Sequence, residues 1–115
     1  MITIYGIKNC STVQKALKFL DNNRVEYTFH DYKKLEIDKE HLQKWCKELS
    51  WQKVLNRSGM MWKKAHDEVK NKVVDQESAI QFMLKVPTSI KRPIIDFDNK
   101  LFIGFDEGQY KTICS

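Results

Sequence analysis

The first thirty residues constrain the fold most, because their hydrophobic pattern changes its period twice. Residues 2–5 (ITIY) form a short apolar run typical of a strand, and a turn follows at residues 6–9 (GIKN). Apolar residues then recur at helical spacing, and residues 25–29 alternate between apolar and polar as in a strand. The pattern predicts a βαβ unit with parallel strands and a right-handed crossover. Its helix is expected to begin near Cys10 and to end at residues 21–23.

The middle of the chain predicts helices. Asp38 is the expected N-cap of a helix whose apolar stripe contains Cys46, so this cysteine is expected in the core. The stretch before Asp75 indicates short helical pieces around a loop, and Asp75 is expected to cap a further helix that Pro87 ends. These elements predict an inserted helical subdomain at about residues 36–90.

The C-terminal part predicts a β-hairpin and a last short helix. Residues 93–97 and 101–105 are apolar runs joined by a polar turn at residues 98–100, which is typical of antiparallel strands. The last helix is expected from Asp106. Together with the βαβ unit, the hairpin predicts a single α/β domain over residues 1–115, built on a mixed four-stranded sheet.

The composition limits the cellular location that we expect for the protein and the classes of partner that it can bind. No run approaches the roughly 20 apolar residues that span a bilayer, and the N-terminus lacks the features of a signal peptide. We therefore expect a cytoplasmic protein with no membrane partner, whose three cysteines are mostly reduced thiols. The net charge of +5 comes from scattered lysines, which is typical of a solvated face and not of a nucleic-acid surface. A small anionic ligand fits this charge better than a nucleic acid.

Cys10 is the main candidate for a reactive residue. It stands at the first turn of the predicted helix, where free backbone N–H groups and the helix dipole favour the thiolate over the thiol. We expect Lys8 to add positive charge, and the hydroxyls of Ser11 and Thr12 to donate hydrogen bonds to the sulfur. The alternative is a buried, inert cysteine, but the polar setting, which includes Asn9, favours a reactive thiol.

Arg92 and Pro93 form the second candidate group, at the start of the first hairpin strand. In the predicted topology this strand begins beside Cys10, where a guanidinium binds an oxyanion or holds a thiolate. An arginine paired with a surface carboxylate explains this pattern equally well. A cis bond before Pro93 is not favoured, since most X-Pro bonds are trans. Arg57, in the loop-like stretch NRSG, is either a site arginine or a solvated loop residue.

Other chemistries find little support in the sequence. His30, His41 and His66 lack the partner spacing of a zinc site. No glycine-rich nucleotide motif, Walker motif or nucleophile-elbow motif is present. We therefore expect no metal and no bound cofactor.

Several stretches of the chain, taken together, resemble the arsenate reductase (ArsC) family, in particular its YffB-like branch, which is related to the Spx regulators. These stretches are ITIYGIKNCSTVQKA, VLNRSGMMWKK, IKRPIID and FIGFDEGQY. The resemblance implies a thioredoxin-like fold with a helical insertion, a catalytic Cys10 assisted by Arg92, and further site residues at Pro93 and Arg57. The residues predicted to bind the substrate or glutathione are Lys8, Asn9, Ser11, Thr12, Arg57 and Pro93.

The chain departs from the pattern of the resembled proteins at two places. Glutathione-coupled arsenate reductases carry a third site arginine near the C-terminus, about where this chain has Gly104. Spx regulators commonly carry a C-x-x-C switch, whereas this chain has Val13 at the second cysteine position. Efficient arsenate reduction is therefore not expected, and a disulfide switch between these two positions is excluded.

The sequence leaves three hypotheses for the function. The first is an oxidoreductase in which Cys10 attacks an oxidised substrate and glutathione, or another small anionic thiol, resolves the mixed disulfide. Cys46 or Cys114 would resolve it only if one of them comes close to Cys10. The second is an Spx-like regulator that binds a protein partner such as RNA polymerase, and the third is a module that binds glutathione without turnover.

Overall fold

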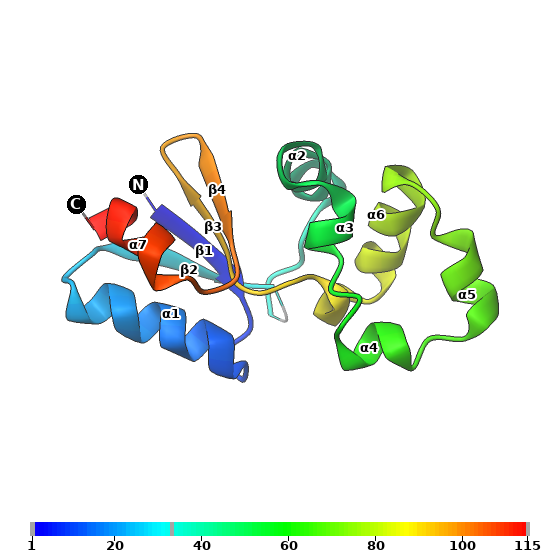
Figure 1. Ribbon diagram of the computed structural model, residues 1–115, viewed down its shortest axis with the longest axis horizontal. Helices are drawn as coiled ribbons and strands as arrows, with labels where there is room; N and C mark the ends of the chain where they lie inside the picture. Colours follow the sequence, from blue (N-terminus) through cyan, green and yellow to red (C-terminus); the bar gives the residue numbers. More distant parts are fainter. Residues whose placement is uncertain (1, 33, 115) are drawn as a thin grey trace. The chain divides into compact units, whose positions relative to one another are not determined.

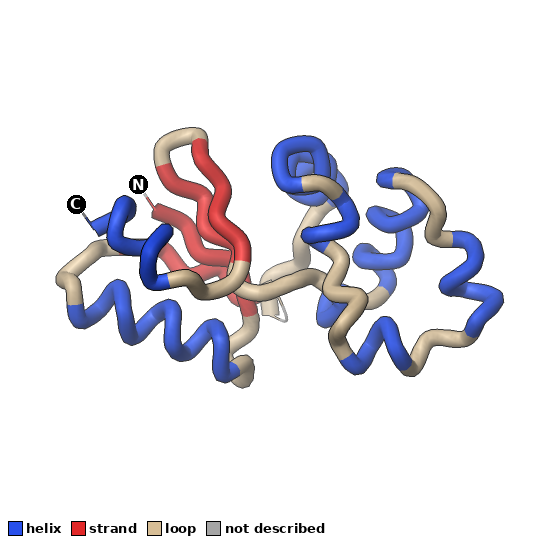
Figure 2. The backbone as a smooth tube through the Cα atoms, viewed as in Figure 1, coloured by secondary structure: helices blue, strands red, loops and turns tan. Residues whose placement is uncertain are grey.

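The computed structural model describes residues 2–32 and 34–114 of the chain. The chain divides into two compact units, Met1–Leu35 with Arg92–Ser115, and Glu36–Lys91. The first unit contains the sheet (Figure 1) and the second is helical, as the colouring of Figure 2 makes plain. Within the described ranges, no helix has both the length and the apolar character needed to cross a bilayer.

The first unit is built on a mixed four-stranded sheet. Its elements along the chain are β1 (Ile2–Gly6), α1 (Ser11–Asn22), β2 (Tyr27–Asp31), β3 (Ile94–Phe97), β4 (Lys100–Ile103) and α7 (Glu107–Cys114). The strand order is β2-β1-β3-β4, with β1 parallel to β2 and antiparallel to β3, and with β3 antiparallel to β4. The predicted mixed sheet, which joins a βαβ unit to a hairpin, is confirmed.

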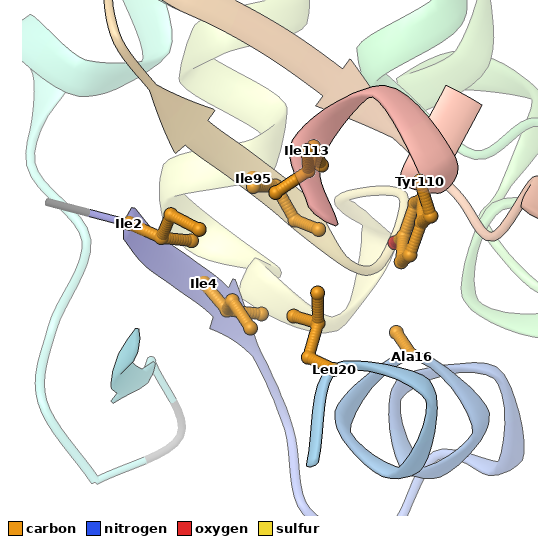
Figure 3. Close-up of a cluster of buried hydrophobic side chains, with 7 residues drawn as sticks. All are labelled: Ile2, Ile4, Ala16, Leu20, Ile95, Tyr110 and Ile113. Atoms are coloured by element: carbon orange, nitrogen blue, oxygen red, sulfur yellow. The ribbon is translucent and has the colours of Figure 1, made fainter. Parts of the chain in front are cut away.

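An apolar core joins α1 and α7 to one face of this sheet (Figure 3). Side chains alternate along a strand, so Ile2 and Ile4 of β1 point to this face, where Ala16 and Leu20 of α1 meet them at i, i+4 spacing. Its fully or largely buried members are Ile2, Ile4, Ala16, Leu20, Ile95, Tyr110 and Ile113. Each fully buried Ile or Leu stabilises the fold by roughly 1.5–3 kcal/mol. The cluster therefore fixes α1 on the sheet, and with it the position of the residue that precedes the helix.

Strand β2 begins two positions later than the apolar alternation from Val25 predicts. Arg24 has a φ of 57°, and the N–H of Val25 donates to the carbonyl of Leu20 at 3.0 Å. The N–H of Val25 is therefore used to cap the C-terminal end of α1, and pairing of β2 with β1 starts only at Tyr27. Val25 nevertheless packs against the core, so the alternation identified the buried face correctly.

The hairpin turn is tighter than predicted. Asp98 and Asn99 have φ values of 52° and 62°, which is typical of a two-residue hairpin turn, so Lys100 pairs with Phe97 and belongs to β4. The strand ends at Ile103 and not at residue 105, because Gly104 has a φ of 75°, which turns the chain away from the ladder.

Removing the hydroxyl of Tyr110 is expected to destabilise the protein by about 1–2 kcal/mol. This side chain is fully buried, and its Oη donates to the carbonyl of Gly104 at 2.7 Å. Urea unfolding of Tyr110→Phe, followed by circular dichroism, measures the loss. Tyr27→Phe is the control, because Tyr27 Oη donates to the carboxylate of Asp21 in an exposed setting, where we expect a loss below about 0.5 kcal/mol. Equal losses in the two variants would contradict the prediction.

The second unit is helical. Its elements are α2 (Lys39–Leu49), α3 (Trp51–Val54), α4 (Met60–Lys63), α5 (Asp67–Lys72), α6 (Gln76–Lys85) and the 3-10 helix η1 (Pro87–Ser89). Asp38 caps α2 and Asp75 caps α6, as the sequence predicts. Cys46 is buried in this unit, which confirms its predicted place in a core.

Candidate functional site

The directions of the strands bring several polar segments to one end of the sheet. β1 and β2 are parallel, so the residues that follow them lie at the same end, and β3 runs antiparallel to β1, so its start lies there too. Cys10 follows β1, Tyr32 follows β2, and Arg92 precedes β3. This end of the sheet is where α/β folds commonly bind ligands.

Cys10 is the N-cap of α1 and lies half-buried with an extended backbone. Its carbonyl accepts the first hydrogen bond of the helix, from the N–H of Gln14 at 3.0 Å. Partial burial acts to raise the pKa of the Cys10 thiol. The N–H of Val13, the guanidinium of Arg92 and the N–H of Thr12 favour the thiolate, and together they outweigh this effect and hold the pKa of the thiol below its usual value.

The first turn of α1 comes very close to the end of β1. A Cβ atom on Gly6 would lie 2.9 Å from Cγ2 of Val13 and 3.6 Å from Cε1 of Phe29. The same turn carries the N–H groups that act on Cys10. Gly6 therefore allows the helix start, and the thiol in front of it, to sit close to the strand.

Replacing Gly6 by alanine is expected to destabilise the protein by about 1–3 kcal/mol, because the new methyl group overlaps the side chain of Val13. Thermal unfolding of Gly6→Ala measures this cost. In a Val13→Ala background the overlap is relieved, so the same substitution should cost at least about 0.5 kcal/mol less. An unchanged cost in that background would rule out the steric explanation.

Arg92 approaches Cys10 from the start of β3. The Arg92 guanidinium is hydrogen-bonded to Cys10, and both this bond and its charge lower the pKa of the thiol. The peptide bond between Arg92 and Pro93 is cis, which the general trans preference of X-Pro bonds did not lead us to expect. The carbonyl of Pro93 accepts a hydrogen bond from the N–H of Gly104 at 2.9 Å. The structure thus brings Arg92 to Cys10, with Pro93 as the next residue in the chain, and the functional roles of all three stay predictions.

Two further residues at this end of the sheet were not identified from the sequence. Tyr32 is only 3% exposed, and it is hydrogen-bonded to the guanidinium of Arg92. Burial raises the pKa of the Tyr32 phenol strongly, although Arg92 acts in the opposite direction. Asp31, the last residue of β2, is a buried carboxylate whose charge acts on Tyr32. The one available signal in the sequence, which was not used, is their position directly after the predicted second strand, because residues that follow parallel strands lie at the same end of a sheet.

The sequence profile of the ArsC family matches residues 5–113. The chain belongs to the ArsC family. An uncharacterised relative from Haemophilus influenzae is 40% identical over 112 residues, which make up 97% of each chain. An uncharacterised protein named YusI, from Bacillus subtilis, is 25% identical over 96% of this chain and 95% of its own.

Solved structures share the fold of this ArsC-family protein. A protein named YffB matches it with a TM-score of 0.96 and 41% identity over the whole of both chains. An arsenate reductase (ArsC) related protein from Brucella melitensis is 43% identical, with a TM-score of 0.77 over 96% of this chain and 92% of its own. An arsenate reductase from Vibrio cholerae is 18% identical with a TM-score of 0.81, over 97% of this chain and 96% of its own, which is a likeness of fold alone. The predicted thioredoxin-like α/β fold is confirmed.

A pocket of about 430 Å³ lies next to the turn that precedes Cys10. Lys8 and Asn9, both predicted binding residues, line it together with Ile7, Asp31 and Lys34. Two lysines and one aspartate therefore line one small pocket, a set of residues suited to a small ligand that carries carboxylates. Of the other predicted binding residues, Ser11 is exposed and Thr12 is half-buried on the first turn of α1.

Arg57 belongs to the second unit, in the loop between α3 and α4. Its guanidinium lies over the ring of Trp51, with Cζ 5.7 Å from the ring centroid. The side chain is thus exposed and rests on an aromatic surface within its own unit. Its predicted role in binding the substrate stays a prediction.

The other two cysteines differ from Cys10 in their surroundings. Burial raises the pKa of Cys46 to about 11, and burial also raises the pKa of Cys114, which packs against the core of the first unit. Among the three thiols, Cys10 alone has a lowered pKa. In the part of the chain that the structure describes, no group of three or more His, Cys, Asp or Glu side chains forms a metal site.

Proposed function

We propose that this ArsC-family protein is a cytoplasmic thiol oxidoreductase, with Cys10 as its single nucleophile and glutathione as the thiol that restores it. The contact between Cys10 and Arg92, which lowers the pKa of the thiol, carries this proposal. A lower pKa increases the fraction of thiolate at neutral pH, and the thiolate is the form that attacks disulfides and oxidised substrates. The 43% identity to an arsenate reductase related protein supports reductive chemistry at this site.

A disulfide is a better substrate for this site than arsenate. β4 ends at the same end of the sheet as Cys10, and Gly104 follows it with a φ of 75° and no side chain. Gly104 stands about where glutathione-coupled arsenate reductases have a third arginine. Without that charge, Arg92 is the cation in hydrogen-bond contact with Cys10, which suits a thiolate or one carboxylate better than an oxyanion with several charges.

The reaction proceeds in three thiol–disulfide exchanges. In the first, the Cys10 thiolate attacks one sulfur of a disulfide R–S–S–R′, so that a Cys10–S–S–R bond forms and R′–S⁻ leaves. In the second, the thiolate of glutathione attacks the mixed disulfide at the sulfur of R, and Cys10 leaves as a thiolate. The products are R′–SH, once it takes a proton from water, and the disulfide of R with glutathione. A second glutathione thiolate then attacks the glutathione sulfur of that disulfide and releases R–S⁻, so that two glutathiones supply two electrons and become oxidised glutathione.

An external thiol is the better resolving group for this mechanism. The pKa of Cys46 and that of Cys114 are raised by burial, so neither provides much thiolate near neutral pH. Glutathione is abundant in the cytoplasm and carries two carboxylates. The pocket beside Cys10 offers Lys8 and Lys34 to those carboxylates, and Asp31 to the glutathione ammonium.

Incubation with oxidised glutathione tests the proposal. Mass spectrometry should find one added glutathione, located on Cys10, and reduced glutathione should then remove it. Cys114→Ser is the matched control and should accept the same single adduct, because Cys114 has a raised pKa. Modification at Cys46 or Cys114 with an unmodified Cys10 would refute the proposal.

A further inference from the structure

Tyr32 occupies a defined place beside the two residues of the thiol site. Its N–H donates to the carbonyl of Gly6 at 3.1 Å, which extends the pairing of β1 with β2 by one residue. The backbone of Tyr32 is thus fixed to the last residue of β1, and the turn that leads to Cys10 starts there. The side chain is 3% exposed, so its phenol is held in one place by its surroundings.

The guanidinium of Arg92 touches both residues. It is hydrogen-bonded to Cys10 and also to Tyr32. A guanidinium is planar and has five N–H donors in a rigid fork, so fixing one side of the group also fixes the direction of the other. A long arginine side chain without such an anchor samples many rotamers.

We infer that Tyr32 is a positioning residue of the Cys10 site: its buried phenol oxygen accepts a hydrogen bond from Arg92 and thereby holds the guanidinium on the Cys10 sulfur. The inference rests on the proposed function in one respect, namely that Arg92 stabilises a reactive Cys10 thiolate. It concerns the orientation of Arg92 and not the identity of the substrate.

A phenol suits this task better than a carboxylate. Burial and the nearby charges of Cys10 and Asp31 keep the phenol of Tyr32 protonated, while Arg92 acts against them with the smaller effect. A neutral acceptor directs the guanidinium without cancelling its charge. The full positive charge of Arg92 therefore remains available to the Cys10 thiolate.

The test measures the pKa of Cys10 in Tyr32→Phe without any substrate. The rate of iodoacetamide alkylation at Cys10 is followed against pH, with the modified peptide counted by mass spectrometry so that Cys46 and Cys114 do not contribute. We expect the pKa of Cys10 to rise by about 0.5–1 pH unit, since Arg92 loses part of its orientation. An unchanged pKa in a folded Tyr32→Phe variant would overturn the inference.

A double-mutant cycle shows whether Tyr32 acts through Arg92. In an Arg92→Met background, Tyr32→Phe should leave the pKa of Cys10 within about 0.2 pH unit of the single variant. The same rise in both backgrounds would mean that Tyr32 acts by another route, which overturns the inference. Tyr27→Phe is the matched control, since it removes a phenol oxygen from the other end of β2 and should leave the pKa unchanged.

Nuclear magnetic resonance of the unaltered protein provides a test that needs no variant. The Nε–H of Arg92 is expected to exchange with water at least about tenfold more slowly than that of the exposed Arg24. Equal exchange at the two arginines would overturn the inference. These measurements are independent of turnover: a protein with a low Cys10 pKa but no thiol transfer would refute the proposed function and leave the role of Tyr32 standing.

Discussion

A Cys10→Ser variant is expected to lose thiol transfer to glutathione by at least about three orders of magnitude. Serine keeps the position at the start of α1, but its hydroxyl has a far higher pKa and forms no disulfide. The interactions that stabilise a thiolate at this place, from Arg92 and from the backbone N–H groups of Thr12 and Val13, then have no nucleophile to act on. The rate of glutathione release from a glutathionylated peptide, measured with a coupled glutathione reductase assay, checks this.

Two further cysteine variants make the Cys10 experiment decisive. Cys114→Ser should retain at least about half of the activity, because Cys114 lies against the core of the first unit and its pKa is raised. Cys46→Ala removes a buried side chain and is expected to lower the stability, with the activity of the folded protein kept. Thiol transfer that survives in Cys10→Ser and disappears in Cys114→Ser would identify Cys114 as the nucleophile and contradict the proposal.

The fold was predictable because the apolar pattern of each element reports which face it buries. Helical spacing identified α1 and the two capped helices, alternation identified β2, and apolar runs identified β1 and the hairpin strands. Cys46 lies in a core, as its helical spacing required. The predictions that were wrong concern the ends of strands, where the backbone dihedral angles determine at which residue a strand begins or stops. The positive φ at Arg24 delays β2, and the positive φ at Asp98, Asn99 and Gly104 sets the limits of β4. Side-chain polarity alone does not specify these dihedral angles.

The candidate site was predictable only where chain position alone determines a contact. A cysteine before a helix meets backbone N–H groups in any βαβ unit, and Arg92 comes near it because β3 starts at that end of the sheet. Tyr32 was missed because an aromatic residue after a strand has the same sequence pattern as an ordinary core residue. Its contact with Arg92 depends on side-chain directions from two different strands, which the pattern of either strand alone does not contain.

An Arg92→Met variant is expected to raise the pKa of Cys10 by about one pH unit, because it removes both a charge-assisted hydrogen bond and a positive charge from the thiolate. The direction of the effect on rate follows from the protonation equilibrium. Below both pKa values the thiolate fraction falls about tenfold for each unit by which the pKa rises, but the more basic thiolate is about threefold more reactive, so alkylation of Cys10 should slow by about threefold there. Arg24→Met is the matched control, since it removes an exposed arginine with the same change in net charge and should leave the profile unaltered.

At high pH the reagent determines whether Arg92→Met still reacts more slowly than the wild type. This difference separates the effect of Arg92 on the pKa of Cys10 from its effect on the binding of glutathione. Above both pKa values Cys10 is fully ionised in either protein, and a thiolate of higher pKa is the stronger nucleophile. With neutral iodoacetamide, Arg92→Met should therefore equal or exceed the wild-type rate, so that the two pH profiles cross. With oxidised glutathione, which is anionic, the variant should remain slower at every pH, because the guanidinium that attracts the carboxylates is gone. Profiles that cross for both reagents would restrict Arg92 to lowering the pKa of Cys10 and exclude it from binding glutathione.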